Sequence, residues 1–296
     1  MIRSPFFYVG DKYKLIKQLN GIFPRNIDHL IEPFCGGGSV FLNIKAKRTL
    51  ANDYNSWMIK LHNYLASFKN NRDAFISSFE KTILSYGLSA SYLGIIVSDE
   101  LKKLHKKTYY AVFNKEAYTK LREDFNNDKN DLLRLYVLLI YGFNHMLRFN
   151  GKGDFNLPVG NVDYNTNVNK ALNAYFDFID SHETHFYNKD FEEFLDNIEI
   201  GKGDIVYLDP PYLISNCEYN KGWTQESDDR LYKAIDKLNR EGHRFILSNV
   251  FTHKGADNDK LIEWAKKYKV HYLTSNYISY HDNTVKPTIE VVITNF

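Results

Sequence analysis

Apolar positions recur along the chain with two different spacings. Short continuous runs of apolar and β-branched residues predict buried strands, whereas apolar residues three or four positions apart predict helices that bury one face. Predicted strands lie within residues 28–31, 49–51, 183–187, 205–208, 243–249, 271–274 and 290–294. Predicted helices lie at residues 13–21, 167–180, 191–197, 225–240 and 257–267. Because strands and helices alternate, the sequence predicts an α/β fold with a doubly wound, mostly parallel sheet.

A long insert without predicted strands interrupts this alternation. Its helical patterns cover residues 59–68, 72–84, 115–125 and 131–146. We therefore predict two domains. Residues 1–58 and 170–296 form the sheet domain, and residues 59–169 form an inserted, helix-rich domain.

Composition places the chain among ordinary globular proteins. Hydrophobic residues make up 44% and charged residues 25% of its 296 residues, and the 22 Tyr and 21 Phe give a high aromatic content. The two cysteines, Cys35 and Cys217, suggest neither a disulfide framework nor a zinc site. No apolar run approaches ~18 residues and no signal peptide opens the chain. We expect a soluble, cytoplasmic protein that does not bind membranes.

The net charge of +2 is unevenly distributed. Residues 59–169 contain 15 Lys and Arg against 11 Asp and Glu, so this segment carries +4 and the remainder −2. A weakly basic insert is compatible with contacts to phosphate groups, although a solvated surface has a similar composition.

A strand followed at once by two prolines marks the first candidate site. The strand predicted at 205–208 ends in Asp209-Pro210-Pro211-Tyr212. Prolines cannot donate to a strand ladder, so the strand ends there and Asp209 lies at its carboxyl end, where open α/β sheets bind ligands. The Asp209 carboxylate and the Pro210 carbonyl can each accept a hydrogen from the N6 amine of adenine, and Tyr212 can stack on the base. The alternative is a strand-ending turn with a surface tyrosine.

A glycine loop marks the second candidate site. Residues 28–41 predict a strand, a loop containing Gly36, Gly37 and Gly38, and a following helix. Glycines let the backbone approach a ligand closely. Asp53 follows the next strand, where such folds place an acid on ribose hydroxyls. A tight turn with a surface aspartate is the alternative.

These motifs occur in one order: Tyr8-Val9-Gly10-Asp11-Lys12, Glu32-Pro33-Phe34-Cys35-Gly36-Gly37-Gly38, Asn52-Asp53 and Asp209-Pro210-Pro211-Tyr212. Together they resemble the Dam-type DNA N6-adenine methyltransferases, which use S-adenosylmethionine and include type II restriction-modification methylases. The family usually has Trp at the position of Tyr8. The resemblance implies that the cofactor contacts Tyr8, Lys12, Glu32, Phe34, Gly36, Gly38, Asp53, Asp190, Phe191 and Asp209. In the family the acid at Asp190 binds the adenine amino group of the cofactor, while an N-cap of the helix at 191–197 is an equally physical role.

The resemblance also implies a target-recognition hairpin that enters the major groove of double-stranded DNA. Residues 141–160 match it, and Arg148 is the expected base reader because arginine pairs bidentately with guanine. Other expected DNA contacts are Asn144, Met146, Pro158, Asn161, Asn220 and Lys221. Trp223 and residues 280–286 are further candidates. The family's Asn-Gly-Leu is Asn144-His145-Met146 here, so the DNA site can differ from GATC.

Four lysines between residues 102 and 107 remain open to two interpretations. They form either a phosphate-binding stripe or a solvated helix face.

We therefore expect direct methyl transfer from S-adenosylmethionine to N6 of a flipped adenine, catalysed by Asp209, Pro210 and Tyr212 without a metal. A cognate restriction endonuclease acting on the same DNA site is an expected partner. Two alternatives remain, an RNA or protein amino-methyltransferase and a non-catalytic DNA-binding regulator.

Overall fold

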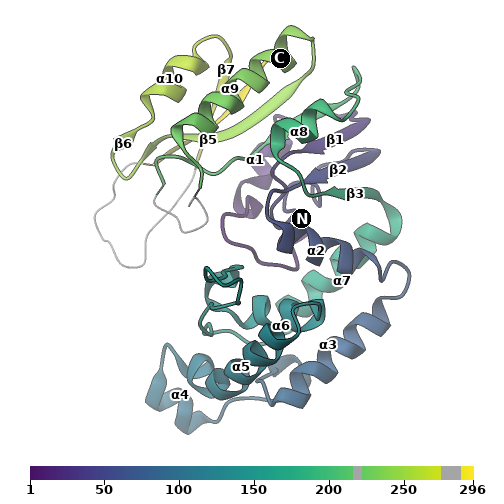
Figure 1. The fold of residues 1–296 in the computed structure, drawn as a ribbon, viewed down its shortest axis with the longest axis vertical. Coiled ribbons are helices and arrows are strands. Elements are labelled where there is room, and N and C mark those ends of the chain that lie inside the picture. The colour runs from purple at the N-terminus through teal and green to yellow at the C-terminus, as the bar shows by residue number, and fades with distance from the viewer. Residues whose placement is uncertain (216–221, 275–287) are drawn as a thin grey trace. The chain divides into compact units, whose positions relative to one another are not determined.

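The computed structural model describes residues 1–215, 222–274 and 288–296, which fall into two compact units (Figure 1). The helical unit comprises Met1–Tyr13, Gly36–Leu42 and Asn55–His182. The sheet unit comprises Lys14–Cys35, Asn43–Tyr54 and Glu183–Phe296. The division of roles predicted from the sequence, with residues 59–169 as the DNA-reading part, stays a prediction.

Hydrogen bonds order the strands of the sheet unit as β3, β2, β1, β4, β5, β8 and β7. Their bounds are β1 His29–Glu32, β2 Arg48–Asn52, β3 Glu183–Tyr187, β4 Ile205–Leu208, β5 Phe245–His253, β7 Lys269–Leu273 and β8 Ile289–Thr294. Pairs from β3 to β5 are parallel, whereas β8 runs antiparallel to both β5 and β7. The short strand β6, Ala256–Asp257, pairs with β5. The predicted mostly parallel α/β sheet is confirmed.

The strand order reverses between β1 and β4. From β1 the chain continues outward to β2 and β3, and it then returns to β4 on the other side of β1. The register pairs Leu30 with Ile205 and Ile31 with Val206, so both strands end at the same edge. Open α/β sheets bind ligands outside the carboxyl ends of strands at such a reversal. Residues that directly follow Glu32 and Leu208 therefore lie where a ligand is expected.

Three helices cover one face of this sheet: α8 Phe191–Asp196, α9 Gln225–Arg240 and α10 Asp259–Ala265 (Figure 1). Their apolar faces join alternate strand residues in one buried cluster, to which Val206 and Leu208 of β4 belong. The intervening residue Tyr207 instead packs against Phe23, with ring centroids 5.6 Å apart. Alternation along β4 thus fills both faces of the sheet, as expected for a strand buried on both sides.

The helical unit contains α2 Ser56–Ala66, α3 Arg72–Tyr86, α4 Asp99–His105, α5 Tyr109–Asn127, α6 Leu132–Tyr141 and α7 Thr166–Ser181. Its centre is α6, which is buried from Leu135 to Tyr141. Aromatic rings pack around it. The ring centroid of Phe75 in α3 lies 5.6 Å from that of Tyr136 and 5.5 Å from that of Phe176 in α7. The high aromatic content of the sequence therefore builds much of this core.

Two predicted helices differ from the structure. The helix expected after the glycine loop is wrong, since residues 39–43 form turns. Leu42 N donates to Gly38 O, but the turns do not continue into a helix. The helix predicted at 131–146 ends at Tyr141 because Gly142 is extended, with φ −76° and ψ 153°. Helix α4 contains Lys102 and Lys103 and has no buried residue, so a helix with a solvated face, one of the two interpretations of this segment, is present there.

Within the described ranges, no helix combines the length and apolar character needed to span a bilayer. In the same ranges, no cluster of three or more His, Cys, Asp or Glu side chains has the arrangement of a metal site.

Candidate active site

The carboxylate at the end of β4 is held by the nearby tyrosine. Asp209 is half-buried, and the Tyr212 hydroxyl donates a 3.0 Å hydrogen bond to its Oδ1 atom. Burial and the neighbouring Asp209 carboxylate raise the pKa of Tyr212 well above its ordinary value. The hydroxyl therefore stays protonated at neutral pH and keeps donating. Pro210 is buried, which holds the intervening backbone in place.

Two further carboxylates lie close to the first residues after β1. Glu32, the last residue of β1, is only 1% exposed. Burial raises the pKa of the Cys35 thiol well above its ordinary value, and the negative charges of Asp53 and Glu32 raise it further. The thiol is thus an unreactive neutral group, and both carboxylates lie near enough to act on it. The predicted cofactor residues Glu32 and Asp53 are brought to one edge of the sheet.

Asn52, the last residue of β2, joins the loops that follow three strands. Its side-chain amide donates to the carbonyls of Pro33, at 2.9 Å, and Lys189, at 3.0 Å. Its Oδ1 atom accepts a 2.9 Å bond from Lys189 N. The side chain is fully buried. The sequence drew attention to Asn52 only as the neighbour of Asp53, and its bracing role was missed because backbone partners leave no residue pattern.

The glycine loop belongs to the helical unit, and it lacks space for a side chain at Gly37 and Gly38. Gly36 and Gly38 have positive φ angles of 48° and 82°. A Cβ atom on Gly38 would lie 2.4 Å from the Phe41 ring, and one on Gly37 would lie 3.0 Å from Cβ of Tyr8. Tyr8 therefore lies directly against this loop. Its hydroxyl accepts a 3.4 Å bond from Asn55 Nδ2.

Lys12 lies in the same N-terminal segment. It is only 8% exposed, and its ammonium group donates a 3.4 Å bond to the Gly10 carbonyl. The predicted contact of Lys12 with the cofactor stays a prediction.

Two polar side chains hold the carbonyls of the glycine loop. His62 Nε2 donates a 2.8 Å bond to the Gly36 carbonyl, and its Nδ1 accepts a 3.2 Å bond from the Tyr175 hydroxyl. Ser4 donates to the Gly37 carbonyl. Neither side chain was predicted, because a lone His on an amphipathic helix and a Ser near the N-terminus carry no motif.

The buried histidine should make folding sensitive to acid. Burial lowers the pKa of His62 from its ordinary value to about 4. Between pH 6.5 and 4, His62 is therefore protonated in the unfolded chain but neutral in the folded chain. The stability that neutral His62 contributes is fully present above pH 6.5 and is lost as the pH falls toward 4. From pH 7 to pH 5 we expect this residue to remove about 2 kcal/mol from the free energy of unfolding.

Urea unfolding of the wild-type chain and of His62→Gln at both pH values measures this effect. The His62→Gln chain should have a lower free energy of unfolding than wild type at pH 7. Its free energy of unfolding should fall less than that of wild type between pH 7 and pH 5. An equal loss in both chains would contradict the assignment to His62.

The loop after β3 combines a capping acid with an aromatic group. Asp190 accepts a 3.0 Å bond from Glu192 N and so caps α8, as one of the two predicted roles required. The Phe191 ring lies 5.3 Å from that of Phe34 and 5.8 Å from that of Trp223. The structure thus brings the predicted cofactor residues Phe34 and Phe191 together, and it adds Trp223, expected only as a DNA contact.

Arg230 of α9 reaches across to this loop. It donates to Asp190 at 2.7 Å and to Glu192 at 2.6 Å, and its guanidinium carbon lies 5.1 Å from the centre of the Phe191 ring. Sequence analysis missed Arg230, since on a helix rich in charges it resembles any solvated residue.

Residues 141–160 form a hairpin within the helical unit. Its base is closed by bonds from Phe143 N to Pro158 O, at 2.9 Å, and from Gly160 N to Tyr141 O, at 2.7 Å. Residues 150–154 form the turn, which Asn150 N closes with a 2.8 Å bond to Asp154 O. The predicted hairpin is therefore present.

Arg148 lies on the first side of the hairpin, shortly before the turn, and contacts the opposite side. Its Nε donates to Asn156 Oδ1 at 3.0 Å, and Nη2 donates to the Asn156 carbonyl at 2.8 Å. The guanidinium therefore has a defined position across the hairpin.

The other predicted DNA contacts are mostly on the same segment. Asn144 and Pro158 are exposed and Met146 is half-buried. Asn161 uses its side-chain oxygen to accept bonds from Tyr110 N and Ala111 N near the start of α5. Asn220, Lys221 and residues 280–286 lie outside the described residues. Among the lysines at 102–107, Lys102 pairs with Asp99 at 3.2 Å, and their predicted phosphate contacts stay a prediction.

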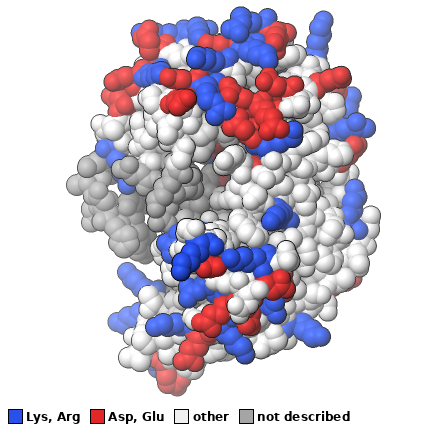
Figure 2. All heavy atoms as spheres, viewed as in Figure 1, with Lys and Arg blue, Asp and Glu red and all other residues white. Residues whose placement is uncertain are grey.

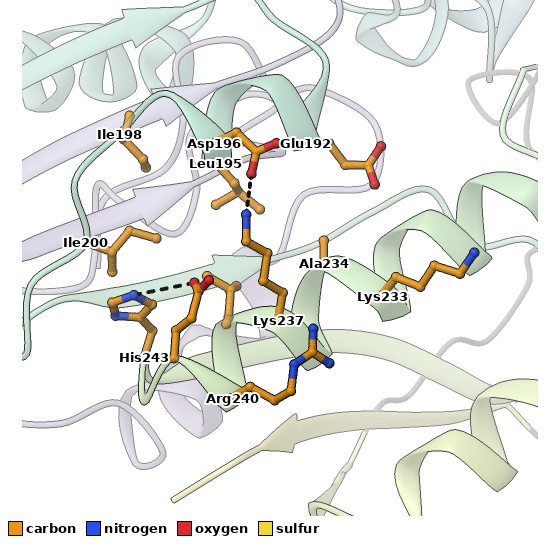
Figure 3. Close-up of a pocket in the computed structure, with 12 residues that line it drawn as sticks. Glu192, Leu195, Asp196, Ile198, Ile200, Lys233, Ala234, Lys237, Arg240 and His243 are labelled. Atoms are coloured by element: carbon orange, nitrogen blue, oxygen red, sulfur yellow. Dashed lines mark hydrogen bonds and ion pairs between the residues drawn. The ribbon is translucent and has the colours of Figure 1, made fainter.

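A surface cavity of about 460 Å³ lies between α8 and α9 (Figure 3). Its lining includes Lys237, which pairs with Asp196 at 2.8 Å, and His243, which lies 3.8 Å from Glu241. None of the lining residues is a predicted site residue. Its charged groups largely neutralise one another, so this groove does not have the character of the substrate site. Acidic and basic side chains are also mixed over the visible surface of the sheet unit (Figure 2).

Comparison with known proteins identifies the family. Residues 8–278 match the model of the D12 class N6 adenine-specific DNA methyltransferases. The chain is 33% identical to the type II methyltransferase M.FokI of Planomicrobium okeanokoites and 33% identical to the modification methylase StsI of Streptococcus sanguinis. Each alignment covers 100% of this chain but only 43% of the relative, so the chain spans less than half of their length.

A DNA adenine methylase of Escherichia coli is 24% identical, with 89% of this chain and 84% of the relative aligned. The family match covers the glycine loop, the two sheet-edge carboxylates Glu32 and Asp53, the hairpin and the strand that ends in Asp209. The chain belongs to the D12 class N6 adenine-specific DNA methyltransferases.

Proposed function

We propose that this chain transfers a methyl group from S-adenosylmethionine to N6 of adenine in a short double-stranded DNA site. The observation that carries the proposal is the half-buried carboxylate of Asp209 at the carboxyl end of β4, where the strand order reverses and a tyrosine hydroxyl orients it. The family and the names of its relatives support a role as the modification component of a restriction-modification system. A restriction endonuclease would then recognise the same DNA site in the cytoplasm.

The residues present fit S-adenosylmethionine. Gly37 and Gly38 let the glycine loop pack against Tyr8 and Phe41, where a Cβ atom would meet those side chains, and the cofactor is proposed to lie beside this loop. Asp53 is proposed to bind the ribose hydroxyls, and Asp190 the adenine amino group. Tyr8 and Lys12 complete the proposed contacts from the N-terminal segment. When bound, the cofactor supplies a methyl group on a positively charged sulfur.

The proposed mechanism relies on orientation of the target amine. The lone pair of adenine N6 is delocalised into the ring, so the amine is a poor nucleophile. The Asp209 carboxylate and the Pro210 carbonyl accept the two N6 hydrogens and draw the nitrogen toward tetrahedral geometry. Tyr212 stacks on the flipped base. Fixing two reactants in attack geometry removes about 7–11 kcal/mol of barrier, so positioning alone supplies much of the catalysis.

A direct test uses duplex DNA from a host without adenine methylation. The DNA is incubated with the chain and S-adenosylmethionine and then sequenced for N6-methyladenine. We expect methylation confined to one short sequence. Methylation of RNA but not duplex DNA would favour an RNA methyltransferase. Failure to bind S-adenosylmethionine in calorimetry, with DNA binding retained, would favour a non-catalytic regulator.

Sequence choice is proposed to depend on Arg148. A bidentate contact with guanine discriminates against the wrong base by about 1–3 kcal/mol. Arg148→Ala should therefore keep its affinity for S-adenosylmethionine, lose activity on the preferred site and lose most discrimination at one base pair. Methylation rates on duplexes that each carry one base change measure this effect.

Two variants serve as controls for Arg148. Asn156→Ala removes one hairpin partner of Arg148 but leaves the guanidinium, so discrimination should persist. Lys103→Ala, if it removes a phosphate contact, should weaken binding to all sequences equally and reduce the salt dependence. If Arg148→Ala slows methylation of every duplex by the same factor, Arg148 does not read a base.

A further inference from the structure

We propose that Arg230 is a positioning residue that makes the chain select a 6-amino over a 6-oxo purine in its cofactor. The inference rests on the proposed use of S-adenosylmethionine. Arg230 lies on α9, outside the sequence motifs, and contacts the N-cap and the first two residues of α8.

The guanidinium of Arg230 bridges two carboxylates and covers a ring. Its Nε donates to Glu192 Oε2 at 2.6 Å, and its Nη2 donates to Asp190 Oδ1 at 2.7 Å. Its guanidinium carbon lies 5.1 Å from the centre of the Phe191 ring. A planar fork that makes three such contacts at once has little freedom to turn. Arg230 therefore ties α9 to the acid and the aromatic residue that are proposed to bind the adenine ring.

The two donors fix the orientation of the Asp190 carboxylate. Oδ1 accepts one bond from Arg230 and another, of 3.0 Å, from Glu192 N. Because the carboxylate is planar, holding Oδ1 from two directions also sets the direction in which Oδ2 points. Without Arg230, the backbone bond alone would remain on Oδ1, and the group would be freer to rotate about its side-chain bonds. The position of the second acceptor oxygen thus depends on Arg230.

An acceptor held in one place distinguishes the two purine types. A 6-amino group donates hydrogen bonds, whereas a 6-oxo group accepts them and presents its oxygen to a carboxylate that can only accept. A site built to pair with a polar group strongly rejects an analogue that cannot pair. A carboxylate free to rotate can turn away from the 6-oxo oxygen, so its preference should be weaker.

Calorimetry with two product analogues tests the proposal. S-Adenosylhomocysteine carries the 6-amino group, and S-inosylhomocysteine carries the 6-oxo group. We expect wild-type protein to bind the former at least about tenfold more tightly. In Arg230→Met this ratio should fall below about threefold, and Arg230→Lys should give an intermediate ratio, since an ammonium cannot form the planar fork. Asp190→Asn, whose amide can also donate, should abolish the preference.

The matched control is Lys237→Met. Lys237 lies about two turns further along α9 and pairs with Asp196 at 2.8 Å (Figure 3). This variant also removes a cation from α9 that pairs with an acid of α8, but its pair lies away from Asp190. The ratio of its affinities for the two analogues should equal the wild-type ratio. That result would exclude a general effect of losing a charge from this helix.

The outcomes separate the inference from the function on which it rests. If Arg230→Met lowers both affinities by the same factor and keeps the wild-type ratio, Arg230 only stabilises the fold and the inference is overturned. If the wild-type chain binds neither analogue, the proposed function fails and the inference fails with it. Circular dichroism checks the folding of each variant. If Arg230→Met does not fold, the ratios of Arg230→Lys and Asp190→Asn decide, and wild-type ratios in both overturn the inference.

Discussion

Asp209→Ala should lower the rate of methyl transfer to duplex DNA by about 10²–10⁴-fold, the range for removing one positioned catalytic group. The substitution removes an acceptor for the N6 amine and the partner of the Tyr212 hydroxyl. The Tyr212 hydroxyl, which burial keeps protonated by raising its pKa, then loses the carboxylate to which it donates. The fold should persist, because Asp209 is half-buried at a strand end and lies outside the apolar core. Transfer of a labelled methyl group to the preferred DNA site measures the rate.

Two variants sharpen this test. Tyr212→Phe keeps the ring for stacking but loses the bond that orients Asp209, so its rate should fall much less than that of Asp209→Ala. Asp229→Ala removes an aspartate of α9 that pairs with Lys260, and its rate should match the wild-type rate. Activity of Asp209→Ala within tenfold of wild type would rule out Asp209 as the residue that orients the amine.

Asn52→Ala should cause the largest loss of stability among the substitutions considered. The side chain is fully buried and makes three hydrogen bonds, to the carbonyls of Pro33 and Lys189 and from Lys189 N. Each buried partner left unsatisfied costs about 1–3 kcal/mol. We expect the free energy of unfolding to fall by about 3–5 kcal/mol, a large share of the 5–15 kcal/mol typical of native proteins. Chemical denaturation measures this loss.

The control for Asn52 is Asn197→Ala. Asn197 also donates from its side-chain amide to a carbonyl, that of Glu193, but it is exposed, so water can replace the lost bond. Its effect should be within about 0.5 kcal/mol. If Asn52→Ala costs less than about 1 kcal/mol, the three loops do not depend on this brace.

The sequence predicted most of the sheet because its strands are local apolar runs bounded by clear stop signals. The strand predicted at 183–187 matches β3, and that at 205–208 matches β4, whose end the prolines after Asp209 mark. It failed at residues 39–43, where the apolar spacing resembles a helix but the structure forms turns. At α4 the sequence offered a solvated helix face only as one of two interpretations, because its surface is polar and none of its residues is buried.

The sequence indicated candidate site residues that belong to motifs and passed over residues that act on backbone or on each other. A motif and a strand end mark Glu32 and Asp53, and the structure brings both near Cys35, while their contact with a cofactor stays a prediction. Asn52 was noticed without its function, and His62 and Arg230 were not noticed. Their partners lie 19 residues or more away along the chain, so no local spacing reveals the pairing.

The hairpin at 141–160 has a consequence for how such proteins diversify. Backbone atoms close its base, and Gly142 and Gly160 pack so tightly that a Cβ on either would lie under 3 Å from its neighbours. The exposed turn residues 150–153 therefore contribute little to closing the base, while Phe155 and Leu157 are buried and the glycines below them cannot change. The segment is built like an interchangeable cassette. Exchange of the hairpin tip between relatives, in evolution or by engineering, would change the DNA sequence that is recognised while the rest of the helical unit keeps its fold.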